Sequence, residues 1–128
     1  MTKRVVVNDE QTALAEYEEI AITGNSGTAI AKTGGIAIGE SDCILSVGDH
    51  GEAIGGVYCF AKAGENGLLD LSYFDPKANK IRRAIAYIGE NGIKADTFYG
   101  VGDDGRFFEA ENFIDGELVR EIEGGENM

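Results

Sequence analysis

The chain has 128 residues, of which 11 are Lys or Arg and 23 are Asp or Glu, so its formal net charge is −12. This length fits one domain, and a hydrophobic fraction of 43% is too high for a wholly disordered chain. The negative charge argues against direct binding of nucleic acid or of anionic membranes, because phosphate affinity comes from Lys and Arg. No apolar run approaches the ~20 residues of a membrane span, so we expect a cytoplasmic protein.

Residues 1–19 predict a small N-terminal cap. Arg4 to Val7 are typical of a short strand. Asn8 or Asp9 is a candidate N-cap for a brief helix that carries Leu14 and Tyr17 on one side. We expect this strand and helix to cover the first turn of the region that follows.

Residues 16–71 repeat with a period of eight. Written as octads, they read EYEEIAIT, GNSGTAIA, KTGGIAIG, ESDCILSV, GDHGEAIG, GVYCFAKA and GENGLLDL. The sixth and eighth positions never carry a charge, and from the second octad onward the fourth position is Gly or Cys. Each octad predicts a short strand and a turn whose glycine supplies a positive φ. Two octads then form one coil, and residues 20–71 form a short β-solenoid.

The two faces of each strand are expected to differ. Because side chains alternate along a strand, the sixth and eighth positions point into the coil and the fifth and seventh point the other way. If the isoleucines at the fifth and seventh positions point outward, they form an apolar stripe that a homodimer or trimer would cover. If they point inward, the coil is wider and the argument for an oligomer weakens. The predicted interface consists of Ile20, Ile22, Ile30, Ile36, Ile38 and Ile54.

Residues 72–128 predict an antiparallel β-meander with an acidic C-terminal segment. Turn signals at 75–79, 90–92 and 103–105 separate β-rich runs, and a last hairpin is expected around Asp115 and Gly116. The candidates for an aromatic core are Phe98, Tyr99, Phe107 and Phe108. The predicted fold is therefore mainly β, and a plain antiparallel meander throughout is the competing architecture.

Two segments resemble known repeat proteins. Gly34-Gly35-Ile36-Ala37-Ile38-Gly39 is similar to the rungs in the heads of trimeric autotransporter adhesins. A closer similarity is to phage and prophage proteins of uncharacterised function, in which short Ala/Gly-rich β-repeats precede a β-rich ending, here residues 92–99 and 105–109. The repeats of this chain are richer in Ile, and Phe98 stands where Trp is expected. The resemblance implies a phage or mobile-element origin, action inside a bacterial host cell and a repeat fold, without a catalytic residue.

Three motifs that carry chemistry in other proteins have simpler explanations here. Residues 100–105 match G-x-G-x-x-G, but a strand pattern follows where dinucleotide binding needs a helix, so a hairpin turn is favoured. His50 follows Asp49 in a turn of the repeat, without an accompanying nucleophile. Cys43 and Cys59, 16 residues apart, are expected to stack as reduced thiols on neighbouring coils, and no suitably spaced Cys or His completes a metal site. We expect no enzymatic activity, cofactor or metal.

The acidic C-terminal segment is the leading candidate for a partner-binding surface. Residues 103–126 include nine acidic and two basic side chains. Such a run is often only a solvated face, but carboxylates on rigid strands can also imitate a phosphate backbone. The candidate residues are Asp103, Asp104, Glu109, Glu111, Asp115, Glu117, Glu121 and Glu123.

Charge, size and resemblance together favour a non-enzymatic inhibitor of a host defence system. Such an anti-CRISPR-like protein would occupy the basic nucleic-acid-binding groove of a protein partner, and binding would weaken as salt rises. The alternative is a structural oligomer, such as a virion, fibre or adhesin-like module in which the repeat is a stiff spacer. A nucleotide-binding sponge would need Lys32, Lys62, Arg82 and Arg83 to line one pocket between subunits.

Overall fold

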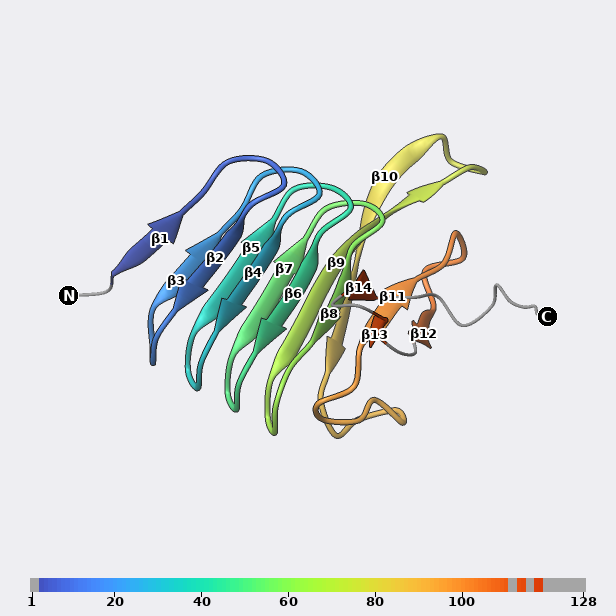
Figure 1. Cartoon of the computed structure of the whole chain (residues 1–128). Coiled ribbons are helices and arrows are strands. Elements are labelled where there is room, and N and C mark those ends of the chain that lie inside the picture. The colour runs from blue at the N-terminus through green and yellow to red at the C-terminus, as the bar shows by residue number, and fades with distance from the viewer. Residues whose placement is uncertain (1–2, 111–112, 115–116, 119–128) are drawn as a thin grey trace.

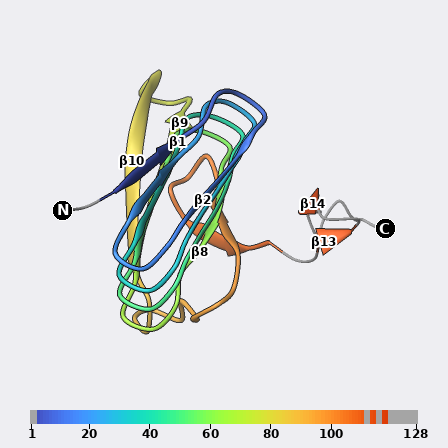
Figure 2. The same cartoon turned by 60° about the vertical axis from the view of Figure 1, so that its left-hand side comes forward.

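The fold comes from a computed structural model, which describes residues 3–110, 113–114 and 117–118. The coiled chain forms two six-stranded sheets that face each other across a narrow core (Figures 1 and 2). Sheet A contains, in spatial order, β1 (Arg4–Val6), β3 (Ile20–Ile22), β5 (Ile36–Gly39), β7 (Glu52–Gly55), β9 (Leu68–Asp75) and β10 (Lys80–Tyr87). Sheet B contains β12 (Phe107–Glu109), β11 (Tyr99–Val101), β8 (Phe60–Lys62), β6 (Ile44–Val47), β4 (Thr28–Ala31) and β2 (Thr12–Ala15).

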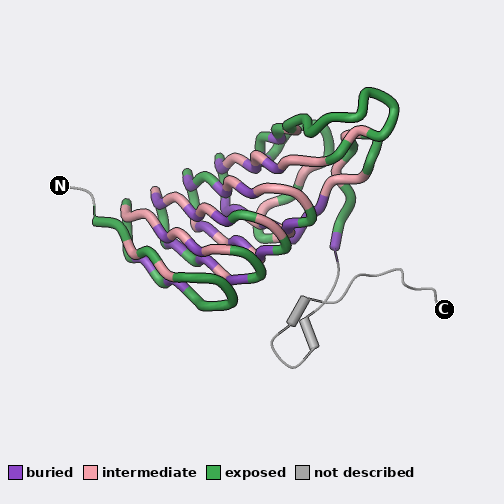
Figure 3. Tube along the Cα trace, turned by 90° about the horizontal axis from the view of Figure 1, so that it is seen from above, coloured by how far each residue is buried: buried purple, intermediate pink, exposed green. Residues whose placement is uncertain are grey.

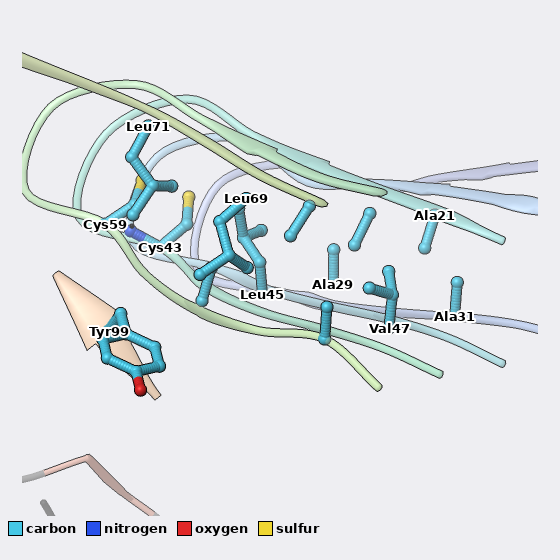
Figure 4. Close-up of a cluster of buried hydrophobic side chains, with 14 of the residues drawn as sticks. Ala21, Ala29, Ala31, Cys43, Leu45, Val47, Cys59, Leu69, Leu71 and Tyr99 are labelled. Atoms are coloured by element: carbon cyan, nitrogen blue, oxygen red, sulfur yellow. Dashed lines mark hydrogen bonds between the residues drawn. The ribbon is translucent and has the colours of Figure 1, made fainter. Parts of the chain in front are cut away.

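The strand register confirms the predicted β-solenoid. Neighbouring parallel strands pair residues that lie 16 apart, such as Ala21 with Ala37 and Ala29 with Leu45. The sixth-position residues from both sheets therefore form the core, and each of them is fully buried (Figure 4). They are Ala21, Ala29, Ala37, Leu45, Ala53, Ala61 and Leu69. Small side chains at most of these positions let the two sheets approach closely.

From Thr23 to Gly67, each corner of the coil has room for one side chain, either at the eighth position or at the fourth position that follows. A Cβ added at Gly51 would lie 2.6 Å from the Cβ of Val47, and one added at Gly39 would lie 2.7 Å from the Cβ of Cys43. Such contacts are closer than side chains tolerate. In these corners glycine therefore stands at the fourth position where the eighth carries a side chain, and at the eighth position where the fourth is Cys. The first two corners differ, since Gln11 follows Val7 and Glu19 follows Ala15.

The predicted role of these glycines in supplying positive φ is wrong. The left-handed residue is the third of each octad: Glu10, Glu18, Ser26, Gly34, Asp42, His50, Tyr58 and Asn66. From Glu10 to His50 the amide of this residue donates to a carbonyl on the next coil, as from Glu10 N to Asn25 O and from His50 N to Glu65 O, each at 2.8 Å. This inter-coil bond offsets part of the strain of a left-handed non-glycine residue.

The N-terminal helix is not present, because the repeat begins one coil earlier than predicted. Thr12 to Ala15 form β2 and pair with β4, while β1 pairs with β3. Ala13 and Ala15 are buried like the sixth and eighth positions of later octads, and Glu10 occupies the left-handed third position. The segment expected to cap the solenoid is thus its first coil.

The antiparallel strands predicted near the C-terminus divide between the two sheets. β10 pairs with β9 and extends sheet A, whereas β11 and β12 pair with each other and extend sheet B from β8. Phe98 and Tyr99 are buried, as predicted for an aromatic core. Phe108 is partly exposed and packs edge-on against Phe60 at a ring separation of 6.2 Å. The last hairpin is confirmed by β13 (Phe113–Ile114) and β14 (Glu117–Leu118), which pair antiparallel.

Candidate binding surfaces

The outer side of sheet A carries most of the predicted oligomer interface. Ile20, Ile22, Ile36, Ile38 and Ile54, here named the isoleucine face, are half-buried residues on β3, β5 and β7. The register places Ile22, Ile38 and Ile54 in one row across three neighbouring strands. Val6 extends this row on β1 and is 64% exposed. The isoleucines therefore point outward, which decides between the two orientations that the sequence leaves open.

One residue of the predicted interface lies on the opposite side of the molecule. Ile30 belongs to β4 and faces outward from sheet B, in a row with Leu14 of β2 and Ser46 of β6. Successive octads alternate between the sheets, so residues share a face only when they are 16 apart. A single flat interface through all six isoleucines is therefore wrong, although the five on sheet A remain together.

The predicted acidic surface is placed only in part. Asp103 and Asp104 are exposed in the turn between β11 and β12, and Glu109 is exposed on β12. Glu109 forms an ion pair with Lys94 at 2.9 Å, and Asp104 lies 3.8 Å from Arg106. The hydrogen bond to Glu109 raises the pKa of Lys94. The described carboxylates here are thus partly neutralised by neighbouring cations. Glu117 lies on β14, while Glu111, Asp115, Glu121 and Glu123 lie outside the described residues.

A larger group of carboxylates lies on the turns of the solenoid. These acidic turns are residues 8–11, 24–27, 40–43 and 56–59 along one edge and residues 16–19, 32–35, 48–51 and 64–67 along the other (Figure 1). They include nine acidic side chains and one basic side chain, Lys32, which pairs with Glu16 at 2.9 Å. The acids are Asp9, Glu10, Glu40 and Asp42 on the first edge and Glu16, Glu18, Glu19, Asp49 and Glu65 on the second. The sequence interpretation, drawn to the C-terminal run, missed this distribution.

Hydrogen bonds between coils hold the second position of several acidic turns. Asp9 Oδ1 accepts from Asn25 N at 2.8 Å, and the side chain of Asn25 accepts from Ser41 N at 3.0 Å. On the other edge Asp49 Oδ1 accepts from Glu65 N at 2.9 Å. The turns are therefore stacked in a fixed order rather than hanging as free loops.

The β9–β10 hairpin has the opposite charge character. Lys77, Lys80, Arg82 and Arg83 lie within seven consecutive residues of a chain that has only 11 basic residues in all. Arg83 contacts both carboxylate oxygens of Asp70, at 3.1 and 2.6 Å, and Arg82 contacts Asp75 at 2.7 Å. These hydrogen bonds lower the pKa of Asp75 and raise that of Arg83. Lys32 and Lys62 lie on the other sheet and its turns, so the described chain does not gather the four bases proposed for a nucleotide sponge.

The two cysteines stack on neighbouring coils as predicted and are free thiols. Cys43 N donates to Cys59 Sγ at 3.4 Å, and Cys43 Sγ donates to Gly24 O at 3.0 Å. The side-chain hydrogen bond with Cys59 lowers the pKa of Cys43 to about 7, whereas the same bond, together with burial, raises the pKa of Cys59. Figure 4 shows both sulfurs beside the core leucines. Among the described residues no group of three or more Cys, His, Asp or Glu could hold a metal ion.

His50 and the glycine-rich segment have structural roles in this fold. His50 is exposed at a left-handed turn position, and the carboxylate of its neighbour Asp49 accepts from Glu65 N. Gly100 lies on β11 and Gly105 in the following turn, where its φ is +81°. No helix begins there, so the segment is the hairpin turn that the sequence favours.

Comparison with known proteins adds no relative. No family model matches the chain, and neither the curated proteins nor the solved structures contain a match. In the part of the chain that the structure describes, no helix is long and apolar enough to span a membrane. The fold and surfaces define the chain as a short two-sheet β-solenoid with acidic turns, an isoleucine face and a basic β9–β10 hairpin.

Proposed function

We propose that this chain is a non-enzymatic binding protein whose acidic turns occupy a basic, nucleic-acid-binding surface of a protein partner. The observation that carries the proposal is the segregation of charge: nine acidic residues and one Lys on the turns. Coils repeat about every 4.8 Å, so on the first edge Asp9 and Glu10 lie two coils, roughly 10 Å, from Glu40 and Asp42, and on the second edge Asp49 lies one coil from Glu65. Carboxylates held at fixed spacings along a rigid edge are suited to a surface built to bind phosphates.

The stiffness of the solenoid supports this role. The turns stack through inter-coil hydrogen bonds from backbone amides, including the bonds that Asp9 and Asp49 accept. Charges fixed before binding cost less ordering entropy than charges on a flexible tail. The C-terminal acids Asp103, Asp104 and Glu109 belong to the proposed surface, but their cationic neighbours make them weaker contributors than the turns.

The partner we propose is a nucleic-acid-handling enzyme of a bacterial defence system. This step depends on the resemblance to phage proteins together with the acidity and small size of the chain. An anti-CRISPR-like inhibitor of this kind acts by excluding DNA or RNA from a Lys/Arg channel, so it needs no catalytic group of its own.

Neutralising one edge of the acidic turns tests the proposal. The variant Glu10→Gln/Glu40→Gln/Asp42→Asn removes three charges from the first edge, and the matched control Glu52→Gln/Glu90→Gln/Asp96→Asn removes three exposed charges elsewhere. Basic nucleic-acid enzymes captured from bacterial lysate on the wild-type chain should be released by salt and by excess duplex DNA. Their affinity should fall about tenfold or more in the turn variant and little in the control. Capture that is indifferent to salt, or equal for both variants, would refute the mechanism.

The isoleucine face favours a second candidate function, a structural module that assembles into an oligomer. A sheet face with five isoleucines and the exposed Val6 is typical of protein–protein contacts. For such a module, Ile38→Asp abolishes association, and the turn variant above leaves it unchanged. The two candidates therefore respond oppositely to the same pair of variants.

A further inference from the structure

Among the described residues, no strand lies beside the outer edge of β10, because β10 ends sheet A. Ile88 N donates to Gly67 O at 3.0 Å, which fixes the alternation of hydrogen bonds along the β9–β10 ladder. The even-numbered residues of β10, such as Ala84 and Ala86, direct their backbone groups toward β9. The odd-numbered residues Ile81, Arg83 and Ile85 direct theirs toward the open edge, as does Tyr87, whose carbonyl also accepts from Glu90 N at 3.1 Å.

The apolar side chains of β10 are more exposed than those on the inner strands of the same sheet. Ile81 is 61% exposed, Ile85 54% and Tyr87 55%. The row of the isoleucine face continues onto β10, because Ile54 of β7 pairs with Asp70 of β9 and Asp70 pairs with Ile85 of β10. Ile22 and Ile38 in that row are half-buried because strands flank them on both sides. One more strand beside β10 would cover its side chains in the same way.

The β11–β12 hairpin does not close against β10. A cavity of about 510 Å³ lies between residues 83–87 of β10 and residues 104–107 of the hairpin, and its walls also include Tyr73, Glu90, Asn91 and Ile93. The arginines of β10 are already paired, Arg83 with Asp70 and Arg82 with Asp75. A second chain approaching this edge therefore does not meet uncompensated guanidinium groups.

We propose that β10 pairs antiparallel with β10 of a second copy of this chain, about a two-fold axis at Ala84. This register places Ile81 opposite Tyr87 and Arg83 opposite Ile85. Each Arg83–Ile85 pair exchanges both backbone hydrogen bonds, and Tyr87 N donates to Ile81 O. Shifting the axis to Arg83 would set two arginines directly opposite, which is unfavourable. Shifting it to Ile85 would leave Ile81 without a partner in the strand.

The pairing joins the two copies of sheet A edge to edge and keeps their isoleucine faces on one side. It gives an isologous contact, in which the same strand serves both subunits. The inference concerns how copies associate, so it does not depend on what the acidic turns bind. It also removes the long free edge that otherwise invites aggregation.

A proline at the open edge tests the backbone pairing. Ile85→Pro removes an amide that points away from β9, so the hairpin of the single chain should persist. Ile85→Thr is the matched control, since it shortens the side chain and keeps the amide. By light scattering we expect the wild type and Ile85→Thr to have the mass of a dimer and Ile85→Pro that of a monomer, with similar β circular dichroism. A monomeric wild type, or a Ile85→Pro dimer that is folded, would overturn the proposal.

Cross-linking tests the register and does not require the proline variant to fold. In the proposed dimer the two copies of residue 84 are a non-hydrogen-bonded pair about 4.5 Å apart, within the range of a disulfide. Ala84→Cys should therefore form a disulfide-linked dimer under mild oxidation by oxidised glutathione, which takes up the two electrons. Arg82→Cys is the control, because its two copies would lie about 13 Å apart along the strands. Equal cross-linking of both variants, or none of Ala84→Cys, would contradict the register, and a dimer lost only in Ile38→Asp would assign the contact to the isoleucine face.

Discussion

The two sheets are alike on their inner sides and different on their outer sides. Inside, both present small uncharged residues in the same columns, and the sixth position is fully buried in each (Figure 3). Outside, one row on sheet A contains Val6, Ile22, Ile38 and Ile54, whereas the corresponding row on sheet B contains Leu14, Ile30, Ser46 and Lys62. Packing between the sheets constrains the inner columns on both sides alike. The outer rows are free of that constraint, and it is there that the two sheets differ in sequence.

The largest expected effect comes from placing the same charge on either side of one strand. Ala37→Asp buries a carboxylate between the sheets and should lower the free energy of unfolding by about 4 kcal/mol or more. Ile38→Asp, the next residue, points outward and should cost only about 1 kcal/mol. Urea denaturation followed by circular dichroism measures both. Similar losses of stability for the two variants would contradict the assignment of residue 37 to the core between the sheets and of residue 38 to the outer face.

The octad pattern was sufficient to predict the inner columns, because a period of eight with strict exclusion of charge leaves few other arrangements. The pattern was insufficient for the outer faces, because alternate octads belong to different sheets. Ile30 therefore lies on sheet B, whereas Ile22 and Ile38 lie on sheet A. The first coil was missed because Gln11 and Glu19 stand where the octads from residue 24 onward have Gly or Cys, and because Asn8 and Asp9 resemble a helix N-cap. Ala13 and Ala15 were the residues that could have predicted this coil, because they fit the sixth and eighth positions of an octad and are buried.

A double-mutant cycle at one corner tests the rule that each corner holds one side chain. Gly51→Ala alone should destabilise the chain by about 1–3 kcal/mol, because its Cβ would lie 2.6 Å from the Cβ of Val47. Val47→Gly alone should destabilise it by a similar amount through lost burial. The double variant reproduces the arrangement of Gly39 and Cys43, so its cost should be smaller than the sum by about 1 kcal/mol or more. Strictly additive costs would show that the two positions do not share space.

The cysteine corners should respond to loss of one thiol by a change in acidity. The pKa of Cys43 is lowered to about 7 by the side-chain hydrogen bond with Cys59. Cys59→Ala removes that donor and should raise the pKa of Cys43, as measured by thiolate absorbance during a pH titration. Cys43→Ala is the complementary control, because the pKa of Cys59 is raised in the wild type and should fall when its partner is absent. An unchanged pKa of Cys43 in the Cys59→Ala variant would contradict the coupling between coils.

The smallest effect is expected at the tip of the basic hairpin, the region most unlike the acidic turns. Arg82 lowers the pKa of Asp75, so the folded carboxylate binds its proton at lower pH than the unfolded one. This contribution to stability is complete above the unfolded pKa of ~3.9 and is lost as pH falls through the folded value. Because the pair is exposed at the surface, the loss should loosen the tip without unfolding the solenoid. The carboxyl resonance of Asp75 should titrate at higher pH in Arg82→Gln than in the wild type. Arg83→Gln, which leaves the Arg82–Asp75 pair in place, is the matched control. Identical titration of Asp75 in Arg82→Gln and in the wild type would show that its ion pair with Arg82 does not contribute. The hydrogen bonds between β9 and β10 alone would then hold the hairpin in register.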